Sequence, residues 1–398
     1  MGSGKTMAAI QRMNADIKNK YIYITPFLLE AERVKKFCPT RNFEEPKNRG
    51  SGKLDNLNYL LGKGFNIAST HALFKSYNQY TVELIKNNNY KLILDEVCDV
   101  VELLQVTKFD RRMLVRDENM KIEQDNSIVW INDEYKGDFL WLMYMVRTGN
   151  VYLYNDNLIF WLFPIEIFKA FKEVIVLTYM FDAQIQRYYY DYNNLGYEYI
   201  GTKKIRNGGY EFCETGYVPE YCKTLIDKVH ILENERLNLI GDTDYTLSSS
   251  WYEREKRKRT KPLTNVMRRN LQNLFRHKFK CEEEQRLWTC YKDSYDSLKG
   301  KGYSDSEKFV SFNARSTNKY AERTHLAYCI NLFMNPNLKK FLTEKGADVN
   351  EDKWALSELI QLIWRTAIRN QGDIWVYIPS RRMRELLQSW LKELSEVA

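Results

Sequence analysis

The first stretch with the residue types for phosphate chemistry is Gly2-Ser3-Gly4-Lys5-Thr6. It matches the second half of the phosphate-loop pattern GxxxxGK followed by Ser or Thr. In that pattern, glycines let backbone N–H groups close around phosphates, the Lys binds the β- and γ-phosphates and the hydroxyl binds Mg²⁺. A helix over residues 8–17 would add its positive end. The five residues therefore predict a nucleoside triphosphate site, with Thr6 as a metal ligand.

The first Gly of the full pattern would lie upstream of Met1, and so would the β-strand that normally leads into such a loop. The chain therefore begins inside its own motif. We expect either a natural reading frame that is longer than this one or a degenerate copy of the motif.

A second pair of residues that could do chemistry is Asp95-Glu96, at the end of the apolar run YKLIL. Two carboxylates at the end of a parallel strand are typical of a Walker B site, where the Asp binds Mg²⁺ and the Glu orients the attacking water. The alternative is that they only cap the next helix. Because Lys5 and Asp95 are separated by the length of one sheet-building circuit, the two motifs together favour the nucleotide site.

Short apolar runs alternate with amphipathic segments through the first half of the chain, a βαβ rhythm that predicts a parallel sheet flanked by helices. The expected strands are 21–25, 65–70, 90–95 and 173–178, and the expected helices between the first three are 28–37, 54–61 and 77–86. Ligands of such sheets bind at the carboxyl ends of the strands. The stretch between Asp95 and Thr178 exceeds one βα unit and includes a predicted hairpin around Asn155.

A polar, Tyr- and Gly-rich stretch near residues 188–210 marks the expected domain boundary. A second α/β alternation follows it. We expect strands at 237–241, 286–292, 309–312 and 373–378, and helices at 263–277, 320–333, 338–344, 354–369 and 381–394. The predicted fold class is α/β, with residues 1–200 and 201–398 as two domains and an aromatic-rich insertion at about 105–165.

Composition excludes several classes of protein. The chain has 398 residues, 44% of them hydrophobic and 28% charged, which is typical of a globular protein with real cores. It contains no apolar run of the length that a membrane span needs and no secretory signal pattern, so we expect a cytoplasmic protein without membrane contact. Seven Cys residues do not form a disulfide framework, and the Cys and His spacings do not predict a zinc site.

The net charge of +8 is concentrated between Trp251 and Lys280, where eleven basic residues face two acidic ones. The basic residues are Arg254, Lys256, Arg257, Lys258, Arg259, Lys261, Arg268, Arg269, Arg276, Lys278 and Lys280. A basic block of this density is typical of a surface that binds a nucleic-acid backbone. The alternative is a solvated helix face or a localisation patch.

The segment QLIWRTAIRN, residues 361–370, resembles motif VI of superfamily 2 helicases. In that family the motif's arginines reach the γ-phosphate across the cleft between two RecA-like domains. On a continuous helix Gln361, Arg365 and Arg369 would share one face. Together with the two Walker-type motifs, the segment makes the chain resemble DEAD/DEAH-type helicases along nearly its whole length.

Weaker resemblances agree with this. Residues 24–26 and 69–71 are similar to motifs Ia and Ib, which implies backbone contacts from Thr25 and Thr70; residues 177–181 and 313–318 are similar to motifs III and V. Similar combinations occur in bacteriophage helicases. The resemblance implies two tandem RecA-like domains, ATP and Mg²⁺ as cofactors, and nucleic acid as partner, DNA before RNA, in phage replication or recombination. The basic residues Arg257, Arg259, Arg268 and Arg269 would add further backbone contacts.

The chain also departs from the family pattern. Cys98 stands at the fourth position of the DEAD or DEAH box, Tyr179 and Met180 replace the usual Ala and Thr of motif III, and the second Arg of motif VI lies one residue late.

Three hypotheses follow. In an ATP-dependent helicase or translocase, Glu96, Gln361, Arg365 and Arg369 would be catalytic, and Gly2, Ser3, Gly4, Lys5, Thr6 and Asp95 would hold nucleotide and metal. A packaging-type ATPase with a nuclease would need a carboxylate cluster in the second half, where Asp242 and Asp244 are the only close pair near a predicted strand end. A nucleic-acid-binding remnant without ATPase activity is the third.

Overall fold

A computed structural model describes residues 3–48, 50, 52–206, 208–214, 225–313 and 319–397. The chain divides into two units that are described separately below. The N-terminal unit comprises Gly4–Cys213 and Pro336–Val349, and the C-terminal unit contains Glu214–Asn335 and Asn350–Ala398. The division follows Cys213 because the hairpin of β10 (Gly201–Lys204) and β11 (Tyr210–Cys213) packs on α1 (Lys5–Ala15).

The N-terminal unit is built on a parallel sheet with the strand order β2-β1-β3-β9. Its strands are β1 (Tyr21–Thr25), β2 (Ile67–Thr70), β3 (Lys91–Asp95) and β9 (Glu173–Leu177). Its helices are α1, α2 (Leu28–Phe37), α3 (Lys53–Gly62), α4 (His71–Phe74), α5 (Gln79–Asn87), α8 (Ile165–Ala170) and α9 (Ile185–Tyr192). The four predicted strands and the α/β fold class are confirmed.

Both faces of this sheet are buried. Tyr21, Tyr23 and Ile93 on one face pack with apolar residues of α1 and α2 in a single core cluster. Ile22 and Leu92 alternate with them along the strands and are also completely buried. Among the other helices of this unit, α5 contacts both α3 and α8. Two buried faces explain why the strands are continuous apolar runs rather than alternating ones.

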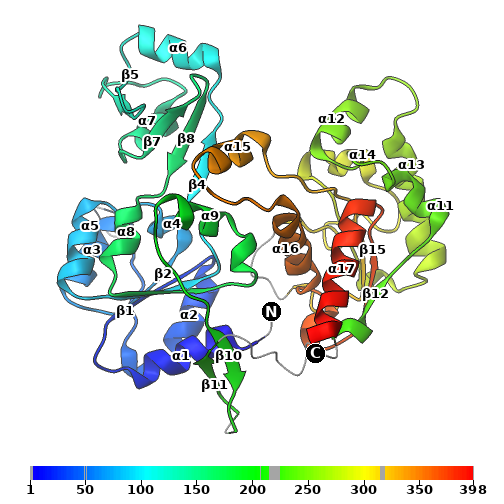
Figure 1. Cartoon of the computed structure of the whole chain (residues 1–398), viewed down its shortest axis with the longest axis horizontal. Helices are drawn as coiled ribbons and strands as arrows, with labels where there is room; N and C mark the ends of the chain where they lie inside the picture. Colours follow the sequence, from blue (N-terminus) through cyan, green and yellow to red (C-terminus); the bar gives the residue numbers. More distant parts are fainter. Residues whose placement is uncertain are drawn as a thin grey trace. The chain divides into compact units, whose positions relative to one another are not determined.

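An antiparallel lobe is inserted between β3 and β9 (Figure 1). It contains β4 (Val101–Leu104), α6 (Lys108–Arg116), β5 (Met120–Ile122), β6 (Ile128–Trp130), α7 (Leu140–Val146), β7 (Val151–Tyr154) and β8 (Leu158–Leu162). The predicted hairpin is confirmed: β7 pairs with β8, and Asn155 and Asp156 adopt left-handed backbone angles, which Asn and Asp tolerate better than most residues.

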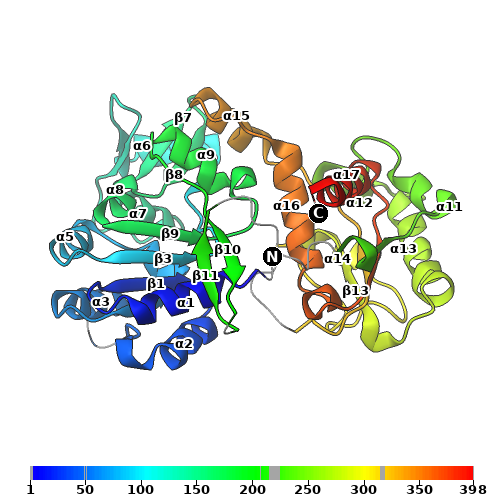
Figure 2. The ribbon, with the colours of Figure 1, turned by 60° about the horizontal axis from the view of Figure 1, so that its bottom comes forward.

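The C-terminal unit has a second parallel sheet with the order β12-β15-β14-β13. Its strands are β12 (Val229–Ile231), β13 (Arg286–Thr289), β14 (His325–Tyr328) and β15 (Ile374–Tyr377). Its helices are α11 (Glu235–Asn238), α12 (Ser249–Arg257), α13 (Leu263–Asn273), α14 (Tyr295–Leu298), α16 (Glu351–Ile363) and α17 (Arg381–Val397), and a π-helical turn follows α13 at Leu274–Lys278. Figure 2 shows the same elements from a second direction.

Several element predictions for this unit are wrong. Residues 237–241 are helical, at the end of α11 and in a following 3-10 turn, because Asn234 caps the helix by accepting a hydrogen bond from the Leu237 amide. Residues 320–333 contain the buried strand β14 instead of a helix. Of residues 309–312, only Phe309 makes a single bridge, to Trp288. Strand β12 was not predicted.

The described residues contain no helix that is both long and apolar enough to cross a membrane.

Candidate nucleotide and nucleic-acid sites

The described part of the phosphate loop turns at Gly4, whose φ of 79° lies in the left-handed region that favours Gly. Helix α1 begins at the next residue, Lys5, and the Ala8 amide donates to the Gly4 carbonyl at 2.8 Å. Ser3 and Thr6 flank this turn and are half-buried. Gly2 lies outside the described residues. The helix therefore opens directly at the sequence motif, as a phosphate loop requires.

Three predicted residues lie at the same edge of the N-terminal sheet. Thr25 of β1 pairs with Thr70 of β2, and Asp95 ends the neighbouring strand β3. Thr70 keeps part of its surface exposed, whereas Thr25 is completely buried. A contact from the Thr25 hydroxyl to a nucleic-acid backbone would require this side chain to become exposed.

Asp95 is held by Tyr23 of the adjacent strand β1 and by His71, the first residue of α4. The Tyr23 hydroxyl donates to Asp95 Oδ2 at 2.6 Å, and His71 Nε2 lies 3.1 Å from the Asp95 carbonyl oxygen. Burial raises the pKa of Asp95 to about 7; the Tyr23 hydrogen bond and Lys5 oppose this rise, and the negative charge of Glu96 adds to it. Sequence reasoning missed Tyr23, whose position two residues before Thr25 gives only a buried-strand signal.

The charges of Asp95 and Glu96 act on Lys5, although the strands β1 and β2 lie between them in the chain. Burial lowers the pKa of Lys5, while the charges of Glu96 and Asp95 oppose that effect. Glu96 has a φ of 66°, and its amide donates to the Leu177 carbonyl at the end of β9 at 3.2 Å. A non-Gly residue in this conformation costs energy and is common at functional sites. The charges of both carboxylates therefore act on the Lys5 ammonium.

The ring of Tyr210 covers the turn of the phosphate loop. A Cβ atom added to Gly4 would lie 2.1 Å from a Tyr210 ring carbon, so the ring occupies the space that any other residue's side chain would need. The Tyr210 amide donates to Gln11 Oε1 of α1 at 2.6 Å, and Arg12 lies over the Phe212 ring at 5.8 Å. The sequence analysis interpreted this Tyr-rich stretch only as a domain boundary and did not predict the contact.

The helical arrangement predicted for motif VI is wrong. Helix α16 ends at Ile363, and Ala367–Asn370 forms a separate 3-10 turn, so Gln361, Arg365 and Arg369 do not share the face of one helix. The Thr366 hydroxyl donates to the Ile363 carbonyl at 2.6 Å, so a side chain satisfies one of the carbonyls at the end of the helix. Arg365 is buried and Arg369 is exposed. The contact of these arginines with a nucleotide stays a prediction.

The basic block forms α12, α13 and the segments around them, and most of its cations are exposed. Its two carboxylates are already paired, Glu253 with Lys256 at 3.0 Å and Glu255 with Lys258 at 2.5 Å. Arg257, Arg259 and Arg269 are exposed and make no ion pair with the described residues, and Arg268 donates to Asn265 at 2.9 Å. The block therefore keeps its positive charge in the folded unit.

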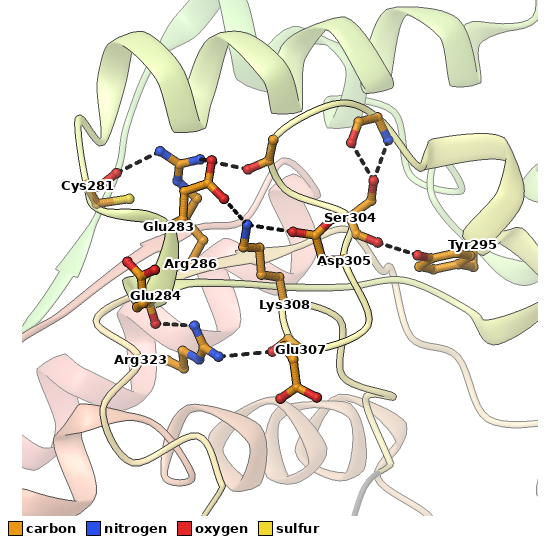
Figure 3. A network of polar contacts seen from close by, with 12 residues as sticks. Cys281, Glu283, Glu284, Arg286, Tyr295, Ser304, Asp305, Glu307, Lys308 and Arg323 are labelled. Carbon is orange, nitrogen blue, oxygen red and sulfur yellow. Dashed lines mark hydrogen bonds and ion pairs between the residues drawn. The ribbon is translucent and has the colours of Figure 1, made fainter.

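The segment that leads to the predicted motif V is fixed by a polar network (Figure 3). Lys308 is buried and pairs with Glu283 and with Asp305, the latter at 2.8 Å. Arg286 donates to the carbonyls of Gly302 and Cys281 at 2.7 and 2.8 Å. Asn313 is the last described residue before a gap at 314–318, so the rest of the motif lies outside the described residues.

The donor set of the N-terminal unit fits Mg²⁺ bound together with a nucleotide. Mg²⁺ takes hard oxygen ligands and is usually held by one or two protein side chains, phosphates and water. Thr6 and Asp95 supply such oxygens. Across the described ranges no three or more His, Cys, Asp or Glu side chains are grouped to hold a metal alone.

Asp242 of the C-terminal unit lies 3.5 Å from Arg381 and 4.0 Å from Arg384, so it is in an ion-pair cluster.

Comparison with known proteins identifies the family. The SPbeta prophage-derived protein YonV of Bacillus subtilis strain 168 is 41% identical over 407 aligned positions, which cover 98% of this chain and 97% of that protein. The chain belongs to the YonV family. Residues 101–161 match the YonV middle domain, and residues 223–391 match the YonV C-terminal Rossmann-like domain.

Among solved structures, an XPD helicase covers 98% of this chain, with 93% of its own chain aligned, at 10% identity and a TM-score of 0.43. A similarity of this extent carries no functional conclusion.

The YonV middle domain corresponds to the antiparallel lobe from β4 to β8. A segment from within the C-terminal match, α15 (Pro336–Glu344), packs on this lobe as part of the N-terminal unit. Phe341 stacks on Phe160 and contacts the edge of Tyr154, with ring centroids 4.4 and 5.2 Å apart. The two YonV domains are therefore interleaved, because part of one packs in the core of the other.

Proposed function

We propose that this protein is a phage-type, ATP-dependent nucleic-acid helicase or translocase. The observation that carries the proposal is that α1 begins at Lys5 directly after the left-handed turn at Gly4, while Asp95 ends β3 and the charges of Asp95 and Glu96 act on the Lys5 ammonium. A lysine at a helix start and two carboxylates at a strand end are the groups that phosphoryl transfer from a nucleotide needs. The prophage origin of the YonV relative supports the phage context.

In this proposal the chain's own residues bind and orient the nucleotide. The α1 amides and the Lys5 ammonium hold the phosphates, and the Thr6 hydroxyl and the Asp95 carboxylate hold the metal. Mg²⁺, when bound with the nucleotide, neutralises phosphate charge. Glu96 orients a water molecule. Its left-handed backbone angle and the hydrogen bond from its amide to the Leu177 carbonyl keep it at the strand end. By the motif VI resemblance, Arg365 and Arg369 would also contact the nucleotide.

The basic block on α12 and α13 holds the nucleic-acid backbone through phosphate contacts. Because such contacts release counterions, affinity should fall steeply as salt rises. ATP hydrolysis should be stimulated by nucleic acid, since the strand and the nucleotide then favour the same state of the protein.

The test is Glu96→Gln, which keeps the size of the side chain and removes its charge. We expect ATP binding to persist while nucleic-acid-stimulated hydrolysis drops by at least about a hundredfold, as for loss of a positioned general base. The matched control is Glu83→Gln, an exposed carboxylate on α5. Wild-type turnover in Glu96→Gln would reject the role of Glu96, and absence of any ATP binding or hydrolysis in the wild-type protein would favour the remnant hypothesis.

A further inference from the structure

A pocket of about 650 Å³ lies in the C-terminal unit, at the turn that leads into α12. Its lining includes Thr243, Asp244, Tyr245, Arg254 and Lys258. This volume is within the range of about 300–1,000 Å³ that is usual for small-molecule pockets. The pocket thus has room for one nucleotide unit and combines aromatic, hydroxyl, acidic and basic groups.

The turn that forms one wall is held in place by its backbone. The Ser248 amide donates to the Tyr245 carbonyl at 3.2 Å, and the Asn331 side chain donates to the Asp244 carbonyl at 2.7 Å. The Asn331 amide donates to the Leu247 carbonyl at 2.9 Å. Three carbonyls of one short turn are therefore satisfied, and the wall is preformed.

The opposite wall is fixed by a buried carboxylate. Glu255 accepts from the Leu263 amide at 2.6 Å and from Lys258 Nζ at 2.5 Å, which joins α12 to the start of α13. The negative charge of Glu255 is thus used within the protein. The guanidinium of Arg254, one residue earlier and exposed, makes no hydrogen bond or ion pair with the described residues, so it can take a phosphate bidentately.

Tyr245 presents an aromatic face at this pocket. Its side chain is 66% exposed, and its ring packs against Phe333 with centroids 5.7 Å apart. Phe333 in turn lies under the guanidinium of Arg382 at 4.4 Å. An exposed Tyr backed by a second ring and a cation is a firm platform, and every nucleobase has a π-face that can stack on such a platform.

We propose that this pocket binds one unpaired nucleotide of a single-stranded nucleic acid, with its base stacked on Tyr245 and its phosphate on Arg254. The mixed charge of the lining distinguishes it from a plain anion site: Asp244 and the Thr243 hydroxyl, which shares a hydrogen bond with the Thr246 hydroxyl, suit the polar edge of a base, not a second phosphate. The strand continues along the basic block, whose cations Arg257 and Arg259 are unpaired among the described residues. Bases inside a duplex are stacked on one another and cannot enter. The inference deepens the proposed function by naming its substrate as a single strand.

The test measures binding of a fluorescein-labelled oligothymidylate, and of an abasic strand of equal length, to the full chain without nucleotide. We expect Tyr245→Ala to weaken binding of the oligothymidylate about five- to a hundredfold. It should leave binding of the abasic strand unchanged, and Tyr245→Phe should restore wild-type affinity. Arg254→Ala should weaken binding of both strands. Matched controls are Tyr80→Ala and Arg112→Ala, exposed residues of the same types in the N-terminal unit.

Equal affinity of Tyr245→Ala and Tyr80→Ala for the oligothymidylate would overturn the proposal, as would an equal loss for both strands. Thermal melting of each variant shows whether the unit remains folded. Since the assay contains no ATP, a chain that binds single strands through Tyr245 but hydrolyses no ATP would keep this inference and reject the motor function.

Discussion

Phe341 of α15 stacks on Phe160 of β8, with ring centroids 4.4 Å apart and ring planes inclined by 18°. Phe160 is completely buried and Phe341 is 3% exposed. The chain leaves the C-terminal unit before Pro336, makes this contact within the N-terminal unit and returns after Val349. A segment belonging in sequence to the second half of the protein thus completes the core of the inserted lobe.

Replacing Phe341 by Ala should detach α15 from the lobe. Loss of a buried Phe costs about 3–5 kcal/mol when the site cannot collapse. Hydrogen exchange in β7, β8 and α15 should therefore speed up, while amides of β1 and β3 keep wild-type protection. The control is Phe109→Ala on α6, where the same chemical change removes a side chain that is 75% exposed. Unchanged exchange in β8 would show that the aromatic stack does not hold α15.

Ala substitutions at Gly4 and Gly149 separate the effect of the Tyr210 contact on stability from the effect of backbone strain. Their φ angles are 79° and 75°, but a Cβ at Gly4 would overlap the Tyr210 ring, whereas a Cβ at Gly149 would meet nothing within 4 Å. Both Ala variants should lose about 1 kcal/mol through the left-handed conformation. Only Gly4→Ala should lose more, by about 1–3 kcal/mol of overpacking.

A double-mutant cycle checks the source of the extra loss. Tyr210→Ala should remove most of the additional cost of Gly4→Ala and none of the cost of Gly149→Ala, with stability measured by hydrogen exchange of α1. Equal effects of the two Gly substitutions would mean that the hairpin does not rest on the phosphate loop in solution.

The N-terminal unit was predictable because its local and global signals agree. The runs at Tyr21–Thr25 and Lys91–Asp95 are short, apolar and bounded by amphipathic segments, and both prove to be completely or largely buried parallel strands. The carboxylates follow directly from the pattern, since Asp95 ends the strand. Tyr210 was not predictable as a neighbour of Gly4, because no local signal specifies where a hairpin packs.

The C-terminal unit was harder because its local signals are ambiguous between helix and strand or are very short. The residues around His325–Tyr328 have apolar side chains at both helical and strand spacing, and periodicity alone cannot decide between a buried helix and a buried strand. Strand β12 has only three residues. Helix α16 ends at Ile363, whose carbonyl accepts a hydrogen bond from the Thr366 hydroxyl, and a Thr that bonds in this way is also common in continuous helices.

His325 should make the C-terminal unit sensitive to acid. The ring stacks on Trp375 with centroids 5.1 Å apart, and burial together with the charge of Arg286 lowers its pKa from 6.5 to about 4. Between these pH values the unfolded chain binds more protons than the folded one. The contribution of His325 to the free energy of unfolding is therefore fully present above pH 6.5 and falls as the pH drops toward about 4. The fall is less than about 1.4 kcal/mol per pH unit, because water screens the half-exposed ring.

Hydrogen exchange of β14 and β15 at several pH values, corrected for intrinsic exchange, measures this effect without assuming that both units unfold together. His325→Gln should flatten the dependence of the opening free energy on pH, while His277→Gln, at an exposed position after α13, should keep the wild-type slope. A wild-type slope in His325→Gln would place the acid sensitivity on other groups. Loss of the slope in His325→Gln would assign the acid sensitivity to His325. The physical reason is that the charged imidazolium must regain water that its ring contacts exclude.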